Sequence, residues 1–189
     1  ESDPTLMEAG REAFKRIESG DPEARRLWQK IKEISLNEFQ SLYELLGARF
    51  DEISGESVYV EKALPTLEKM KADGLAVESE GAMIVDLEPH DMPPCLLQKS
   101  DGTTLYELRD LAAVIDHFDR FGFYRMVYVV GGEQKLRFRQ IFKILELMGH
   151  QWADRCVHVD FGLVKFVDEA TGKAIKGSTR KGRMVMLKN

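Results

Sequence analysis

The stretch MVYVVGGEQ, at residues 126–134, decides the fold that this sequence predicts. Five apolar residues followed at once by two glycines are typical of a parallel strand that helices cover on both faces and that ends in a tight turn. Similar short strands are expected at 95–98 and 156–167, with amphipathic helices between the strands at 105–119 and 136–148. The order strand, helix, strand, helix, strand predicts an α/β fold with a Rossmann-like parallel sheet, half of a doubly wound one.

The residues before this sheet predict two helices within 4–47. Asp3 and Asp21 each precede a proline, which is a common way to begin a helix, and Gly20 and Gly47 stand where the two helical patterns end. The second helix carries an apolar stripe made of Leu27, Ile31, Ile34, Leu42, Leu45 and Leu46. A stripe of this kind implies a buried face.

A small insertion is predicted between these helices and the sheet. Residues 62–73 predict a third helix, in which Pro65 is tolerated only in the first turn. Alternating apolar residues on either side of Glu80-Gly81 predict a β-hairpin. The predicted division is a helical segment at 1–50, a connecting insertion with helix and hairpin at 51–92, and the Rossmann part at 93–189.

Composition and charge exclude several classes of protein. The chain has 189 residues, of which 43% are hydrophobic and 31% charged, as expected for a globular protein and not for a disordered or membrane-spanning one. A net charge of -5 excludes a basic coat for nucleic acid over the whole surface. The N-terminus lacks the pattern of a signal peptide, so cytoplasm is the expected location. The only cysteines, Cys95 and Cys156, are expected to be buried, and no metal site is indicated.

Tyr106 and Asp110 are the first candidate site residues. They lie four residues apart near the start of a predicted helix, so both project from one face, close to the carboxyl end of a strand. A carboxylate beside a phenol suits a cation, and a guanidinium is the best geometric match because it can donate two parallel hydrogen bonds. The alternative is a solvated helix on which Arg109 pairs locally with Asp110.

The loop after the central strand offers a second set of candidates. Glycine at Gly131 permits close approach of a ribose or phosphate, and the Gln134 amide can both donate and accept. Neither GxGxxG nor GxxxxGK[ST] occurs, which disfavours a dinucleotide dehydrogenase and a P-loop NTPase. His158 alternates with valines in a strand, which is typical of a hydrogen-bonded core imidazole.

The C-terminal stretch is strongly basic. After Glu169 there is no acid, whereas six cations follow: Lys173, Lys176, Arg180, Lys181, Arg183 and Lys188. Cations beside glycine, serine and threonine suit a grip on a polyphosphate. The alternative is a basic, solvated tail.

Taken together and in order, several stretches resemble the catalytic core of arginyl-tRNA synthetase, a class I aminoacyl-tRNA synthetase. They are LWQKIKEISL at 27–36, ESEGA at 78–82, PPCLLQKSDGTTLY at 93–106, RDLAA at 109–113, YVVG at 128–131, HVxFGLV at 158–164 and KGSTRKG at 176–182. The resemblance implies the second half of the class I nucleotide fold and an enzyme that activates arginine with ATP and transfers it to tRNA(Arg). It also implies ATP with Mg²⁺ as substrate, no dedicated protein metal site, no membrane and a monomer.

The resemblance also implies roles for individual residues. Tyr106 and Asp110 would hold the substrate guanidinium, and Gln134 would fix the amino-acid end of the substrate. The expected ATP-binding residues are Gly131, His158, Val159, Gly162, Leu163, Lys176, Ser178 and Thr179. The expected catalytic residues are Lys176, Ser178 and Arg180, in the loop that grips the phosphates.

Three departures from the family pattern stand out. Gly177 replaces a residue that is more often methionine, and Arg137 replaces one that is commonly histidine. No His-x-Gly-His element occurs, although the family carries one in the first half of the fold. We therefore expect a truncated chain, inactive alone, without that first half or the helical anticodon-binding domain. Alternatives are a non-catalytic paralogue or assembly module that keeps the fold, and an unrelated Rossmann-type nucleotide enzyme.

Overall fold

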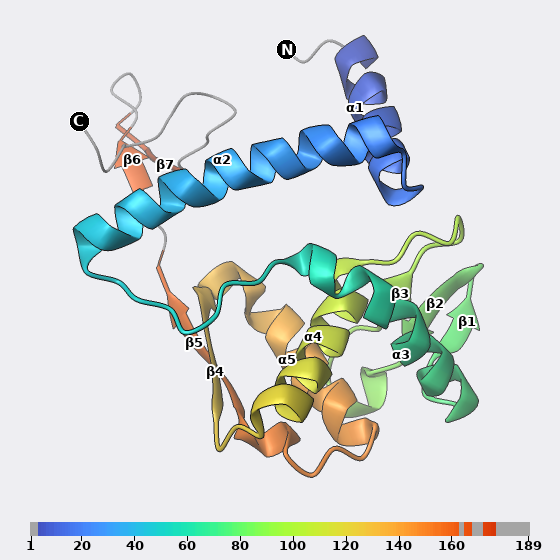
Figure 1. The fold of residues 1–189 in the computed structure, drawn as a ribbon. Helices are drawn as coiled ribbons and strands as arrows, with labels where there is room; N and C mark the ends of the chain where they lie inside the picture. The colour runs from blue at the N-terminus through green and yellow to red at the C-terminus, as the bar shows by residue number, and fades with distance from the viewer. Residues whose placement is uncertain (1–3, 163–164, 168–171, 177–189) are drawn as a thin grey trace. The chain divides into compact units, whose positions relative to one another are not determined.

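The computed structural model describes residues 4–162, 165–167 and 172–176 (Figure 1). These residues divide into two compact units, the first ending at Ile53 and the second beginning at Ser54. The first unit contains the helices α1 (Pro4–Glu18) and α2 (Pro22–Leu46). Two helices were predicted at these positions, and both are confirmed.

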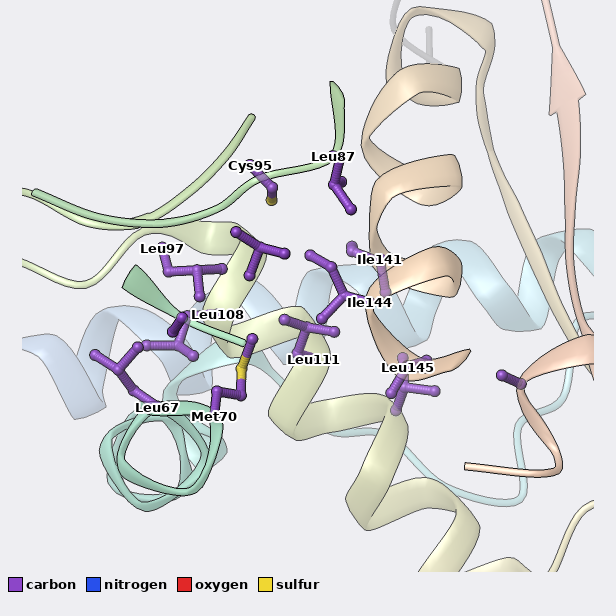
Figure 2. Packing of buried hydrophobic residues seen from close by; sticks show 14 of the residues in the cluster. Leu67, Met70, Leu87, Cys95, Leu97, Leu108, Leu111, Ile141, Ile144 and Leu145 are labelled. Atoms are coloured by element: carbon purple, nitrogen blue, oxygen red, sulfur yellow. The ribbon is translucent and has the colours of Figure 1, made fainter. Parts of the chain in front are cut away.

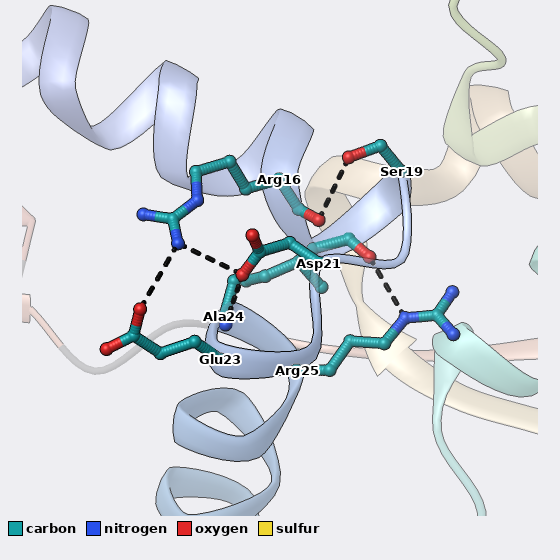
Figure 3. Close-up of polar contacts among 7 residues, drawn as sticks. Arg16, Ser19, Asp21, Glu23, Ala24 and Arg25 are labelled. Atoms are coloured by element: carbon teal, nitrogen blue, oxygen red, sulfur yellow. Dashed lines mark hydrogen bonds and ion pairs between the residues drawn. The ribbon is translucent and has the colours of Figure 1, made fainter.

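A cluster of polar contacts fixes the corner between α1 and α2 (Figure 3). The Asp21 carboxylate accepts a hydrogen bond from the Ala24 amide at 2.7 Å, which caps α2 and lowers the pKa of Asp21. Arg16 forms ion pairs with Asp21 at 3.0 Å and with Glu23 at 3.6 Å. Arg25 donates through Nε to the Ile17 carbonyl at 3.3 Å. The turn is therefore defined by its own side chains, as the Asp-Pro pattern predicts.

The predicted burial of the apolar stripe on α2 is wrong for the described residues. None of the α2 residues is buried, and Ile31 and Ile34 keep 64% and 60% of their surface exposed. The reason is that, within the described part of this unit, only the shorter α1 is available to cover a helix of 25 residues.

The second unit contains the remaining helices and strands. The longer helices are α3 (Val60–Ala72), α4 (Tyr106–Phe121) and α5 (Lys135–Leu147). The strands are β1 (Val77–Ser79), β2 (Ala82–Val85), β3 (Cys95–Gln98), β4 (Met126–Gly131), β5 (Cys156–Phe161), β6 (Lys165–Val167) and β7 (Ala174–Lys176). Four short 3-10 helices are η1 (Glu56–Val58), η2 (Glu88–His90), η3 (Gly132–Gln134) and η4 (Ala153–Arg155). No helix in the described ranges is long and apolar enough to cross a membrane.

The predicted hairpin is confirmed, whereas α3 begins earlier than predicted. Glu80 and Gly81 have φ angles of 52° and 79°, the backbone that a two-residue turn between β1 and β2 requires. Helix α3 begins at Val60, so Pro65 lies in its second turn and not in its first. Burial of Tyr59 explains the earlier start, because its carbonyl accepts the first amides of the helix and its hydroxyl bonds His117 of α4 at 2.8 Å.

The predicted order of strand, helix, strand, helix and strand is confirmed by β3, α4, β4, α5 and β5. The predicted parallel pairing of the first strand is wrong, because β3 does not pair with β4 or β5 in the described residues. Strand β3 pairs antiparallel with β2, with Cα partners such as Val85 and Cys95. Its burial alternates, with Cys95 and Leu97 buried and Leu96 exposed, as in a strand with one face on the core. Among the strands of the described residues, only β4 and β5 pair in parallel, joined by α5. The strand predicted at 156–167 is divided, because β5 ends at Phe161 and β6 pairs instead with β7.

The core of this unit lies where α3, α4 and α5 meet β2 and β3 (Figure 2). Its fully buried side chains include Leu67, Met70, Leu87, Leu97, Leu108, Leu111, Ile141, Ile144 and Leu145. Both cysteines are buried, as predicted, and burial raises the pKa of the Cys95 thiol to about 12.

The parallel pair is covered on one face only, in contrast to the prediction. Tyr128 packs on Phe138 of α5, whereas Val129, on the opposite face of β4, is 65% exposed. On β5, Val159 and Phe161 are likewise about half exposed, at 48% and 52%. Within the described part of the second unit, no helix packs on this face, which leaves an apolar strand surface in that unit uncovered.

Candidate functional site

The guanidinium group of Arg137 is the centre around which the predicted arginine-binding residues lie. Its Cζ atom is 5.5 Å from the centre of the Tyr106 ring, and Nη2 forms an ion pair with Oδ2 of Asp110. Nη1 donates to Oε1 of Gln134 at 3.2 Å. The structure therefore brings Tyr106 and Asp110 of α4 together with Gln134, which directly precedes α5.

Each of these positions follows from local structure. Tyr106 is the first residue of α4 and Asp110 lies one turn later, so their side chains share a face. Gln134 ends η3, and Arg137 follows three residues later in the first turn of α5, so the two meet on one side of that helix. Helices α4 and α5 pack against each other, which joins the two halves of the site.

Arg109 does not form the local pair with Asp110 that was considered as an alternative. Its Nη1 donates instead to Glu56 of η1 at 2.7 Å, and its Nη2 lies 3.4 Å from both oxygens of Thr104. Its Cζ atom is also 5.8 Å from the centre of the Tyr106 ring. The site thus holds two guanidinium groups, each with its own carboxylate: Arg109 with Glu56, and Arg137 with Asp110.

The charge of Asp110 is set by opposing influences. Burial raises the pKa of its carboxyl group, and the Arg137 cation works in the opposite direction. Glu107 and Glu56 add smaller effects that raise the pKa of Asp110. A partly buried carboxylate of this kind gains from a bound cation, so the position suits recognition of a positively charged group.

The predicted ATP-binding residues, unlike the predicted arginine-binding residues, do not all face one point. His158 bonds through Nε2 to the Val130 carbonyl at 2.9 Å and stacks on Phe138 at 4.6 Å, as the core-imidazole interpretation predicts. Val159 points to the other, open face, since neighbouring side chains on a strand alternate. The side chains of His158 and Val159 therefore do not share a face of the strand pair.

Gly131 is buried at the end of β4, beside Gly132. A Cβ atom on Gly132 would lie 3.1 Å from Oδ2 of Asp160, so this turn brings the chain close to the end of β5. Gly162 is exposed just after that strand. Leu163, Ser178, Thr179 and Arg180 lie outside the described residues, and of Lys176 only its place at the end of β7 is described.

Sequence reasoning missed two features of the site. Glu56 lies 53 residues before Arg109, and no pattern in the sequence connects them. Arg137 was noted only as a departure from the family pattern, although its spacing of three from Gln134 on a helix indicates that the two side chains can meet.

Comparisons with known proteins give a consistent result. The family described as "tRNA synthetases class I (R), catalytic domain" matches residues 1–189. Among curated relatives, the arginine--tRNA ligase of Clostridium botulinum (strain Alaska E43 / Type E3) is 48% identical over 187 residues, which is 99% of this chain and 32% of that protein. The arginine--tRNA ligase of Halothermothrix orenii is 48% identical over 189 residues, 100% of this chain and 32% of that protein.

Solved structures resemble the chain as well. The arginyl-tRNA synthetase of Plasmodium falciparum superposes with a TM-score of 0.73 at 27% identity, over 83% of this chain and 28% of that one. The arginyl-tRNA synthetase of Thermus thermophilus has a TM-score of 0.55 at 20% identity, over 89% of this chain and 38% of that one, and shows the fold alone. The chain spans about a third of the length of the curated relatives that it matches.

Proposed function

Because this chain belongs to the family of class I tRNA synthetase (R) catalytic domains, we propose that it is the catalytic core of an arginine–tRNA ligase. In the proposed reaction, the carboxylate of arginine attacks the α-phosphate of ATP and pyrophosphate leaves. The arginyl group then passes from the adenylate to the terminal ribose of tRNA(Arg). The protein's contribution to such a reaction is positioning and stabilisation of charge.

One observation supports arginine as the substrate most strongly. The aromatic ring of Tyr106, the Asp110 carboxylate and the Gln134 amide oxygen all contact a single guanidinium group, that of Arg137. A stacking surface, a carboxylate and a neutral acceptor match the flat, multiply donating shape of a guanidinium better than the compact ammonium of lysine. We assign the side chain of substrate arginine to this position.

The nucleotide is assigned to the edge where β4 and β5 end. Gly131 and Gly162 are assigned to the ribose, and Val159 and Leu163 to the base. His158 acts there through its main chain and as a positioning residue, since its Nε2 is bonded to Val130. Lys176, Ser178, Thr179 and Arg180 are assigned to the phosphates, where ATP brings its own Mg²⁺ as part of the substrate. The proposal includes tRNA(Arg) as partner, a monomeric state and a cytoplasmic location.

Pyrophosphate exchange into ATP that depends on arginine tests this function. The measurement uses the full-length protein that carries this chain and compares Asp110→Asn with Asp119→Asn, an exposed acid on the same helix. Loss of the Asp110 charge removes the partner of the substrate cation, so we expect the KM for arginine to rise about 10- to 100-fold. The Asp119 variant is expected to behave like the wild type.

Two results contradict the proposal. An unchanged arginine KM in Asp110→Asn removes the assignment of the cation subsite. Absence of arginine-dependent exchange in the full-length wild-type protein, both with and without added tRNA(Arg), removes the ligase function itself and favours a non-catalytic paralogue that retains the fold.

A further inference from the structure

We propose that Arg137 is an internal competitor of the substrate, whose own guanidinium fills the arginine subsite until substrate arginine displaces it. The inference rests on the proposed function, because it assigns the same three residues to the substrate cation. It adds an affinity-limiting role for a residue to which neither the family match nor the relatives' names give one.

The contacts of Arg137 are those that a bound arginine would need. Its guanidinium lies 5.5 Å from the Tyr106 ring centre, pairs with the Asp110 carboxylate and donates to Gln134 at 3.2 Å. Stacking, charge pairing and a neutral hydrogen bond are thus used at once, by the same chemical group that the substrate presents. The subsite is occupied by a side chain of the protein itself.

Simultaneous binding of Arg137 and substrate arginine is disfavoured, because both would use the same contacts and because like charges repel. Arg109 is already paired with Glu56 at 2.7 Å, and Arg137 with Asp110. A third guanidinium at Tyr106 would lie beside those of Arg109 and Arg137 in a partly buried site, where charge repulsion is weakly screened. Substrate binding therefore requires Arg137 to give up Asp110 to the incoming arginine.

Two features of the Arg137 side chain favour its departure from the subsite. A quarter of its side-chain surface is exposed, so the long side chain has a short path to water. Its Nε atom is buried and has no hydrogen-bond partner within the described part of the chain. This destabilises the conformation in which Arg137 occupies the subsite. The competition is consequently modest, and the apparent affinity for arginine is reduced by the fraction of molecules in which Arg137 occupies the subsite.

The test measures the KM for arginine and the KM for ATP separately in the full-length protein. Arg137→Ala frees the subsite, and we expect the KM for arginine in pyrophosphate exchange to fall about three- to tenfold, with a smaller change in the KM for ATP. Arg137→Lys keeps the charge but lacks the planar guanidinium, so its KM for arginine should lie between those of the wild type and Arg137→Ala. Arg139→Ala removes a like charge two residues later on α5, from an exposed position away from this site, and serves as the matched control.

Calorimetric titration with arginine in the absence of ATP gives a second readout. It should show tighter binding in Arg137→Ala by the same factor as the fall in KM. An arginine KM and Kd that are unchanged or raised in Arg137→Ala overturn the inference, since Arg137 would then be a neutral or supporting part of the pocket. If Arg137→Ala fails to fold by circular dichroism, Arg137→Lys decides by the same criterion.

The two proposals fail in different ways. Arginine-dependent exchange that is present in the wild type but insensitive to Arg137 removes only the competitor role. Absence of exchange in the wild type removes the function on which that role rests.

Discussion

Asp110 combines partial burial with a cationic neighbour, and this combination makes its charge state a sensitive property of the site. Burial raises the pKa of its carboxyl group, Arg137 lowers it, and Glu107 and Glu56 raise it further. Because arginine binds to the ionised carboxylate, affinity should weaken as pH falls through this raised pKa.

The pH dependence of kcat/KM for arginine tests this balance. In the wild type, kcat/KM should fall on the acidic side with an apparent pKa above that of an ordinary aspartate. Arg137→Ala removes the group that lowers the pKa, so the acidic limb should move to higher pH, whereas Arg139→Ala should leave it in place. An acidic limb that is unchanged or moves to lower pH in Arg137→Ala is incompatible with this account of Asp110.

At the residue scale, the sequence predicted what helical spacing can show. Tyr106 and Asp110 are four residues apart on one helix, and their shared face is a local property. The partner of Arg109 was not predictable in this way, because Glu56 comes from a separate element 53 residues earlier. The same limit applies to Asp110, whose ion-pair partner lies on α5.

At the scale of elements, the packing of α3 on α4 supports the helix that carries Tyr106 and Asp110. Leu67 on α3 is fully buried, and Leu108 and Leu111 of α4 lie in the same core. Lys62 of α3 also pairs with Asp116 of α4, which lowers the pKa of that acid through its hydrogen bond. The site helix is therefore held by both apolar and polar contacts.

Two leucines on α3 provide a matched test of this support. Leu67→Ala should reduce the free energy of unfolding by about 3 kcal/mol, because it leaves a cavity among buried side chains. Leu64→Ala, on the same helix but 50% exposed, should cost about 0.5 kcal/mol. The two values follow from urea unfolding curves monitored by circular dichroism, and equal losses would contradict the observed packing of α3.

Element types were more predictable than strand pairing. The capped helix at Asp21 and the turn at Glu80-Gly81 follow from local backbone preferences, and both occur. The partner of β3 does not follow from such preferences, since the sequence of an apolar strand has a similar pattern whether the strand pairs with β2 or with β4. Cys95, Leu96 and Leu97 are all apolar in the sequence, so the alternation of their burial, which is typical of a one-sided antiparallel strand, appears only in the structure.

At the scale of the whole molecule, the chain corresponds to about a third of its curated relatives. The face of the parallel pair that carries Val129, Val159 and Phe161 is exposed in the described residues. The residues assigned to the phosphates lie partly outside them. Tests of function therefore belong to the full-length protein, in which the whole nucleotide site can be examined.

A crystal structure of the full-length protein with bound arginine tests the central claim most directly. The account predicts the substrate guanidinium against the Tyr106 ring and paired with Asp110, with the Arg137 side chain turned away toward solvent. Bound arginine at any other place, with Arg137 still paired to Asp110, would contradict the assigned subsite and the displacement together.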